Sequence, residues 1–281
     1  MTHKEVNMRR VVFNQKGGVG KSSIAANLAA ISAKAGLKTL LIDLDPQSNS
    51  SAYLLGRGAE INRRNSAEFF KTTLSFKLLP ARGVDYVRPT PYENLSVITA
   101  SPELADIQSS LEMKHKIYKL RDLLDTLSDY EAIYIDTPPN YNFYTMSALI
   151  ASDVCLIPYD CDEFSRQALY TLMQNVEEIK ADHNAKLEVE GIVVNQFQAR
   201  ASLPLQNIHE LKSEGLPVLD SIISSSVKMK ESHNASVPLI EMLPNHKLTQ
   251  EFIALFQELH PNITCENLVY RDKKQAEIVQ D

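Results

Sequence analysis

Apolar residues along this chain fall into short continuous runs separated by stretches with helical spacing. Residues 9–14 predict a short buried strand around Val-Val-Phe, and residues 38–43 form a nearly continuous apolar run, which is typical of a strand buried on both faces. Residues 21–35 carry isoleucine and leucine at helical spacing, and Gly36 follows as a helix stop. The order strand, helix, strand predicts a βαβ unit with a right-handed crossover.

The same alternation continues to residue 259. Further strands are predicted at 95–99, 132–136, 154–158, 189–195 and 218–223. Further helices are predicted within 102–128, where we expect two, and at 141–151, 163–181, 204–214, 227–233 and 247–259. Strands that alternate with helices and are apolar on both faces predict an α/β fold, with a mostly parallel twisted sheet and helices on both faces.

One domain is expected over residues 1–263, because no repeat or break in composition divides the chain. Within it, residues 57–94 contain prolines and arginines without clear periodicity, and we expect an irregular surface insertion with short helices there. Residues 264–281 are polar and charged, which predicts a C-terminal tail that frays.

Composition excludes several classes of protein. The 281 residues are 44% hydrophobic and 23% charged, as in globular domains. The net charge of −6 excludes nucleic-acid binding through bulk positive charge, so any such contact must be a local patch. Cys155, Cys161 and Cys265 lack CxxC spacing and predict reduced thiols. With no secretory signal and no apolar run long enough to span a bilayer, we expect a cytoplasmic protein.

A glycine-rich loop, KGGVGKS at residues 16–22, lies between the first predicted strand and the first predicted helix. Glycines let backbone N–H groups approach phosphates, and the helix N-terminus adds partial positive charge. Lys21 and Ser22 end the pattern GxxxxGK[ST], but Gln15 stands where that pattern begins with glycine, and Lys16 is an additional lysine. The loop is therefore a variant phosphate-binding loop, and the expected fold is a single P-loop NTPase domain.

This loop resembles the deviant Walker A motif of the ParA/MinD family of P-loop ATPases. Asn14-Gln15 before the loop, DLDPQSN at 43–49, AIYIDTPPN at 132–140 and SVKMKES at 226–232 occur in the order typical of its ParA (Soj-like) branch. The resemblance implies an ATPase that uses ATP and Mg²⁺ and forms a homodimer when ATP is bound.

The resemblance also implies roles for the loop residues. Lys21 would bridge the β- and γ-phosphates, Ser22 would ligate Mg²⁺, and Ser23 would reach the α-phosphate. Lys16 would cross a face-to-face dimer and contact the phosphates of the other subunit, as an arginine finger does. Asn195 would lie near the adenine. The predicted nucleotide-binding residues are Lys16, Gly17, Gly18, Val19, Gly20, Lys21, Ser22, Ser23 and Asn195.

Aspartates end two of the predicted strands. Asp43 and Asp45 point the same way by strand alternation, toward the carboxyl edge of the sheet. The resemblance makes Asp45 the residue that orients or deprotonates the attacking water, and Asp43 a support for the magnesium shell. Asp136, after an apolar strand, would hold Mg²⁺ through a water. The predicted catalytic residues are Lys16, Lys21 and Asp45.

Relatives in this branch bind DNA without sequence preference as ATP dimers, through phosphate contacts. The Pro-Arg pair that often precedes the SVKMKES-like segment is replaced here by Ser224-Ser225. The candidate DNA contacts are Arg200, Lys228 and Lys230, with Lys247 less favoured. The resemblance further implies a ParB-like activator, slow turnover without it, nucleoid association when ATP is bound, and a role in DNA segregation or intracellular cargo positioning.

Two alternatives are less favoured. A MinD-like membrane-associated positioning ATPase needs a C-terminal amphipathic helix, but residues 267–281 are mixed in charge and weakly apolar, so no stable membrane binding is expected. An iron–sulfur reductase needs cysteines at a dimer face, whereas Cys155 lies in a predicted buried strand; an amide-forming synthetase belongs to the same metabolic class. The histidines show no metal-ligand spacing, and we expect most of them to be exposed.

Overall fold

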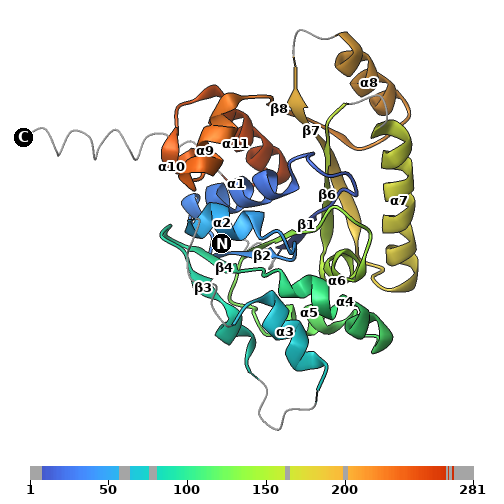
Figure 1. Cartoon of the computed structure of the whole chain (residues 1–281). Coiled ribbons are helices and arrows are strands. Elements are labelled where there is room, and N and C mark those ends of the chain that lie inside the picture. Colours follow the sequence, from blue (N-terminus) through green and yellow to red (C-terminus); the bar gives the residue numbers. More distant parts are fainter. Residues whose placement is uncertain are drawn as a thin grey trace, which may run out of the picture.

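The computed structural model describes residues 8–56, 64–75, 81–161, 165–198, 202–263, 265 and 268. At its centre is an eight-stranded sheet (Figure 1). Its strands are β1 (Met8–Val12), β2 (Thr39–Asp43), β3 (Arg88–Pro89), β4 (Leu95–Ile98), β5 (Ala132–Asp136), β6 (Val154–Tyr159), β7 (Glu188–Phe197) and β8 (Val218–Ser224). They lie in the order β3-β4-β2-β5-β1-β6-β7-β8, and only the pairing of β3 with β4 is antiparallel. The predicted mostly parallel sheet is confirmed.

Helices cover both faces of this sheet (Figure 1). One face carries α1 (Lys21–Lys34), α2 (Asn49–Leu55), α9 (Val227–Ala235), α10 (Leu239–Met242) and α11 (Lys247–Leu259). The other carries α3 (Ser66–Thr73), α4 (Glu103–Met113), α5 (Lys119–Asp125), α6 (Phe143–Ala151), α7 (Ser165–Asp182) and α8 (Ser202–Ser213). No helix in the described part of the chain is long and apolar enough to cross a bilayer.

Two apolar clusters, one on each face, hold the layers together. Neighbouring residues of one strand enter opposite clusters, as Val11 and Val12 do in β1 and Ile133 and Tyr134 do in β5. Successive side chains of a strand point to opposite faces, so a continuous apolar run buries both. This is the burial that the apolar runs predict.

Strand β1 is shorter than the predicted run, because the chain turns at Asn14. The Asn14 side chain donates to Pro158 O at 2.6 Å and accepts from Lys16 N at 2.8 Å. Helix α2 was not predicted, because the Asn-Ser-Ser at its start gives no apolar periodicity. It forms where Tyr53 and Leu54 can be buried.

The segment expected to be a surface insertion is only partly one. Within its described residues, the short helix α3 and a 3₁₀ turn at Gly83–Tyr86 confirm the predicted short helices. However, Phe70 and Tyr86 are 0% and 3% exposed and belong to the main cluster. Phe70 packs edge-on against Phe143 and Tyr144 of α6, so this segment is part of the core. Arg64 is exposed, whereas Arg63 lies outside the described residues.

The core also extends past residue 263. Cys265 and Leu268, within the predicted polar tail, are 4% and 5% exposed and join the cluster around α1 and α11. The rest of that tail lies outside the described residues. Cys155, Cys161 and Cys265 are buried free thiols, as the sequence predicts.

The outer strand β8 is covered by carboxylates of α11. Glu258 accepts hydrogen bonds from Asp220 N at 2.7 Å and Ser221 N at 2.8 Å. Glu251 accepts from Ser224 N at 2.8 Å and from Ser224 Oγ at 2.7 Å. Backbone donors along this edge of the sheet are thus satisfied by the chain's own helix.

A buried charge network ties the sheet to α11 at the amino end of β1. Arg10 is 1% exposed, and its Nε and Nη2 donate to Glu190 Oε2 and Oε1 at 2.5 and 2.6 Å. Its Nη1 lies 3.0 Å from His260 Nε2, and its guanidinium lies over the Tyr134 ring at 5.3 Å. Burial, followed by the charge of Arg10, lowers the pKa of His260 to about 3. Arg10 therefore faces a neutral imidazole and depends on Glu190 for its countercharge.

Glu190→Gln should lower the free energy of unfolding by about 2–3 kcal/mol, because it leaves the Arg10 charge buried without a carboxylate. The matched control is Asp125→Asn. Asp125 forms a 2.9 Å ion pair with the adjacent Arg9, and its side chain is 61% exposed. That change should cost less than about 1 kcal/mol. Urea denaturation of both variants measures the difference, and equal losses would show that Arg10 does not depend on Glu190.

Candidate functional site

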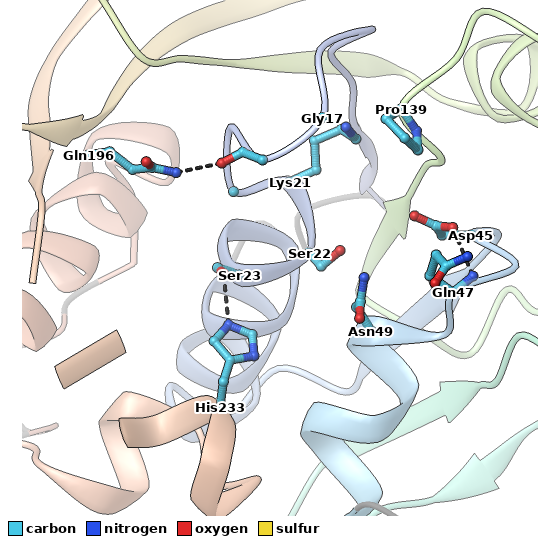
Figure 2. Close-up of a pocket in the computed structure, with 12 residues that line it drawn as sticks. Gly17, Lys21, Ser22, Ser23, Asp45, Gln47, Asn49, Pro139, Gln196 and His233 are labelled. Carbon is cyan, nitrogen blue, oxygen red and sulfur yellow. Dashed lines mark hydrogen bonds between the residues drawn. The ribbon is translucent and has the colours of Figure 1, made fainter. Parts of the chain in front are cut away.

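A cavity of about 360 Å³ lies at the carboxyl edge of the sheet, where the chain leaves β1 between β5 and β6 (Figure 2). This is the place where ligands bind in open α/β sheets. The cavity is lined by Gly17, Gly18, Gly20, Lys21, Ser22, Ser23, Asp45, Gln47, Asn49, Pro139, Gln196 and His233. The structure thus brings the predicted loop residues and Asp45 together around one space.

Backbone geometry shapes the glycine loop. Gly18 and Gly20 have φ of +80° and +91°, a region that favours glycine. A Cβ on Gly20 would also lie 2.2 Å from Asn195 Nδ2. The loop is held from β7, because Asn195 Nδ2 donates to Val19 O at 2.7 Å and Gln196 Nε2 donates to Gly18 O at 2.5 Å. Asn195, predicted near the adenine, therefore also anchors the loop.

Lys21 begins α1 with its side chain turned back over the loop. It is 6% exposed, and its Nζ donates to Lys16 O at 3.1 Å. Burial lowers the pKa of Lys21, and the charges of Asp136 and Asp45 oppose that shift. An ammonium group in this position can bind an anionic ligand over the loop.

Asp43 and Asp136 lie side by side, because β2 and β5 pair in parallel with these residues in register. Both are fully buried. Burial raises the pKa of each, and the charge of Asp136 raises that of Asp43 further. Hydroxyl groups partly stabilise the charged forms: Ser50 Oγ donates to Asp136 Oδ2 at 2.6 Å, and Ser51 Oγ donates to Asp43 Oδ2 at 2.7 Å.

The two carboxyl groups differ in what remains available for a ligand. Asp43 Oδ2 also accepts from Ser51 N at 2.9 Å and Asp43 Oδ1 from Asp45 N at 3.0 Å, so Asp43 holds the loop that follows β2. Asp136 Oδ1 is buried and has no hydrogen-bond partner among the described residues. Oxygen donors of this kind, together with the Ser22 hydroxyl that lines the cavity, fit a magnesium ion.

Asp45 faces the cavity from the loop after β2 (Figure 2). It is 6% exposed, and its Oδ1 accepts from Gln47 N at 2.9 Å. Burial raises the pKa of Asp45, while the hydrogen bond from Gln47 and the charge of Lys21 oppose the shift. A carboxylate held in this way can orient a water molecule and accept its proton.

Lys16 is not among the residues that line the cavity. Its side chain is 35% exposed, and its Nζ forms a 2.7 Å ion pair with Asp160, which follows β6. The ammonium group therefore lies at the rim of the site on the side of β6.

A second cavity of about 260 Å³ adjoins the first and shares Gly20, Ser23, Gln196 and His233 with it. It is also lined by Asn195, Ile223, Ser224, Ser225, Ser226, Met229 and Lys230. The two cavities together form an elongated cleft that runs from the glycine loop to the start of α9. Ser23, predicted at the α-phosphate, is one of the four shared residues, which form the junction (here called the waist) between the two cavities.

Sequence reasoning assigned no role to several residues that line the cleft. Gln47, Asn49 and Pro139 lie inside the motifs at 43–49 and 132–140, and this position could have indicated that they border the site. Gln196 directly follows the predicted Asn195. His233 had no signal, because no metal-ligand spacing includes it, and it is half-buried rather than exposed.

The candidate DNA contacts are only partly brought together. Lys230 is exposed at the rim of the second cavity. Lys228 Nζ is paired with Glu231 at 2.7 Å on the same helix, and Lys247 Nζ lies 3.6 Å from Glu251. Arg200 lies outside the described residues.

Comparisons with known proteins agree with this geometry. A family model described as an AAA domain matches residues 9–189. The chain is 33% identical over 252 residues to the chromosome partitioning protein ParA of Myxococcus xanthus, covering 88% of this chain and 86% of that protein. It is 30% identical over 254 residues to the sporulation initiation inhibitor protein Soj of Bacillus subtilis, covering 89% and 97%.

Among solved structures, cobyrinic acid a,c-diamide synthase from Mycobacterium smegmatis, with bound ATP analogue and magnesium, superposes with a TM-score of 0.71. The match covers 82% of this chain and 92% of that protein at 23% identity, so it is a likeness of fold. The identity to ParA over most of both chains is the closer relation in sequence. Together with the glycine loop and the aspartates that follow β2 and β5, this identity shows that the chain belongs to the ParA family of P-loop ATPases.

Proposed function

We propose that this protein is a ParA-type ATPase that hydrolyses ATP to ADP and phosphate and acts in DNA segregation or intracellular cargo positioning. The observation that carries the proposal is the cleft itself. It combines a glycine loop at a helix N-terminus, the buried Lys21, the buried carboxyl group of Asp136 and the cavity-facing Asp45. Membership of the ParA family supports the same activity.

In this proposal a nucleotide lies along the cleft with its phosphates over the glycine loop. The backbone N–H groups of the loop and the Lys21 ammonium bind the β- and γ-phosphates. Ser23, at the waist, contacts the α-phosphate. The base lies in the second cavity, where Asn195 is a lining residue. The 2.7 Å bond from Asn195 to Val19 O then connects the base end of the cleft to the phosphate end.

Hydrolysis needs a positioned water and neutralised phosphate charge. The Ser22 hydroxyl and, through a water, Asp136 would hold Mg²⁺. When bound there, Mg²⁺ would neutralise charge on the phosphate oxygens. Asp45 orients the attacking water and accepts its proton as the oxygen bonds to the γ-phosphorus and the bond to the β-phosphate oxygen breaks. The raised pKa of Asp45 makes it a stronger base than an exposed aspartate.

Lys16 is proposed to act across a dimer. Its ammonium lies at the rim of the cleft and outside the lining of its own cavity, paired with Asp160. From the rim it can contact the phosphates of a second copy that docks face to face and stabilise charge on the transferred phosphoryl group. The ATP-bound dimer would bind DNA without sequence preference and be stimulated by a ParB-like protein. Cytoplasmic location, with nucleoid association in the ATP state, follows from that role.

Asp45→Ala should bind ATP and dimerise as the wild type does, but its hydrolysis should fall by about 10²–10⁴-fold because the general base is lost. Asp45→Asn is the matched variant, since its Oδ1 can still accept from Gln47 N. It should be equally inactive. Phosphate release in single-turnover assays measures both, and wild-type turnover in either variant would contradict the role.

Lys16→Ala should lose ATP-dependent dimerisation and hydrolysis, because no cation then reaches the phosphates of the other subunit. Static light scattering with and without ATP reports the association. Lys38→Ala is the control, since the exposed Lys38 ammonium forms a 3.8 Å pair with Asp129 and lies 5.1 Å from the Tyr130 ring, at the amino end of β2 and away from the cleft. Full ATP-dependent dimerisation of the Lys16 variant would refute the crossing contact.

ATP-loaded protein should retard a non-specific DNA duplex at low salt, and ADP-loaded protein should not. The retardation should weaken steeply as salt rises, because phosphate contacts release counterions. Lys230→Ala should reduce the retardation, whereas Lys119→Ala, on the opposite face of the sheet and paired with Asp122, should not. Equal mobility of the ATP and ADP states would remove DNA binding from the proposed function.

A further inference from the structure

His233 joins α9 to the nucleotide cleft at its waist. A hydrogen bond of 2.8 Å links His233 Nε2 to Ser23 Oγ, in the first turn of α1 (Figure 2). The same two residues line both cavities of the cleft. Any ligand that extends from the glycine loop into the second cavity must therefore pass this hydrogen bond.

The imidazole is held in place by stacking. The His233 ring lies 4.1 Å from the Tyr53 ring, with an interplanar angle of 25°. Tyr53 is 1% exposed, and its Oη lies 2.5 Å from Ser232 Oγ and 3.3 Å from Asn27 Oδ1. Because Tyr53 is fixed by α1 and α9 at once, the ring that stacks on it has a defined position.

Helix α9 is firmly attached at one end and borders the cleft at the other. Near its C-terminus, Ser232 is fully buried and donates to Val237 O at 2.5 Å. Near its N-terminus, Met229 and Lys230 line the second cavity. His233 directly follows Ser232, so a change in the His233 contact acts at the buried end of α9, and the helix carries that change to the first turns that border the cleft.

We propose that His233 is a positioning residue that couples nucleotide occupancy of the cleft to the conformation of α9. The proposal rests on the proposed function in one respect: the cleft must bind a nucleoside di- or triphosphate with Ser23 at the α-phosphate. A serine hydroxyl has one hydrogen to donate. When that hydrogen goes to a phosphate oxygen, Ser23 can bond to His233 only by accepting from Nε2–H. An imidazole that accepts from Ser23 in the empty cleft must then change tautomer or move together with α9.

This coupling gives α9 a means of sensing the ligand that does not require α9 to touch the phosphates over the glycine loop. The first turns of α9 carry Lys228 and Lys230, and Val227 at its start is 69% exposed. A partner that binds this surface would contact these three side chains. The response of the helix is thus transmitted through one imidazole whose orientation is set by Tyr53.

Hydrogen–deuterium exchange of the amides of residues 227–235, in the full chain with and without saturating Mg-ADP, tests the proposal. In the wild type, ADP should change the exchange rate of this helix by about threefold or more. His233→Phe keeps an aromatic ring to stack on Tyr53 but cannot bond to Ser23, and it should abolish the difference. His233→Gln restores a hydrogen-bonding group and should recover at least part of it. His209→Phe, on α8 and in neither cavity, is the control.

Calorimetric titration with ADP separates the possible failures. Loss of one hydrogen bond should weaken ADP binding by at most about tenfold, so saturation remains attainable. If ADP does not bind the wild type, the proposed function fails. If ADP binds but α9 exchange is unchanged, or if His233→Phe responds as the wild type does, the role of His233 is refuted. If α9 responds but DNA is not retained, the DNA contact fails and the role of His233 stands.

Discussion

Two carboxyl groups in register on neighbouring parallel strands are the constraint on which the site depends. Asp43 and Asp136 are both fully buried, so each raises the cost of ionising the other. Lys21 and the hydroxyls of Ser50 and Ser51 offset part of that cost. Helices α1 and α2, which pack on the sheet through buried apolar residues, thus also bring these groups to the ends of β2 and β5. A cation bound beside this pair would stabilise the charged form of both carboxyl groups.

Much of the fold could be predicted, because continuous apolar runs report strands that are covered on both faces. The βαβ unit at the start and the helices near residues 141–151 and 247–259 were found in this way. Helix α2 was missed, since its burial depends on Tyr53 and Leu54 meeting α1 and not on a repeating pattern. Phe70 and Tyr86 were expected at the surface for the same reason: an irregular segment can still supply aromatic side chains that fill a gap beside α6.

The residues of the site also differ in how far the sequence predicts them. Residues whose chemistry is carried by a local motif, such as Lys21, Asp45 and Asp136, were predicted, and Lys21 and Asp45 line the cavity while Asp136 ends β5 beside it. Gln196 and His233, which reach the cleft from far along the chain, were not, although the neighbouring Asn195 was. Ser23 and His233 are 210 positions apart, and Gln196 and Gly18 are 178 apart. Such contacts arise from the packing of α9 and β7 against the loop, which no short pattern encodes.

The carboxylates of α11 that cover β8 bear on how two copies can meet. An outer strand with free backbone donors invites a second sheet to add onto it. Here Glu251 and Glu258 occupy donors of Asp220, Ser221 and Ser224, and they place negative charge along that margin. Continuation of the sheet from one molecule into the next is therefore disfavoured at β8, which is consistent with the proposed dimer meeting at the mouth of the cleft and not at this edge.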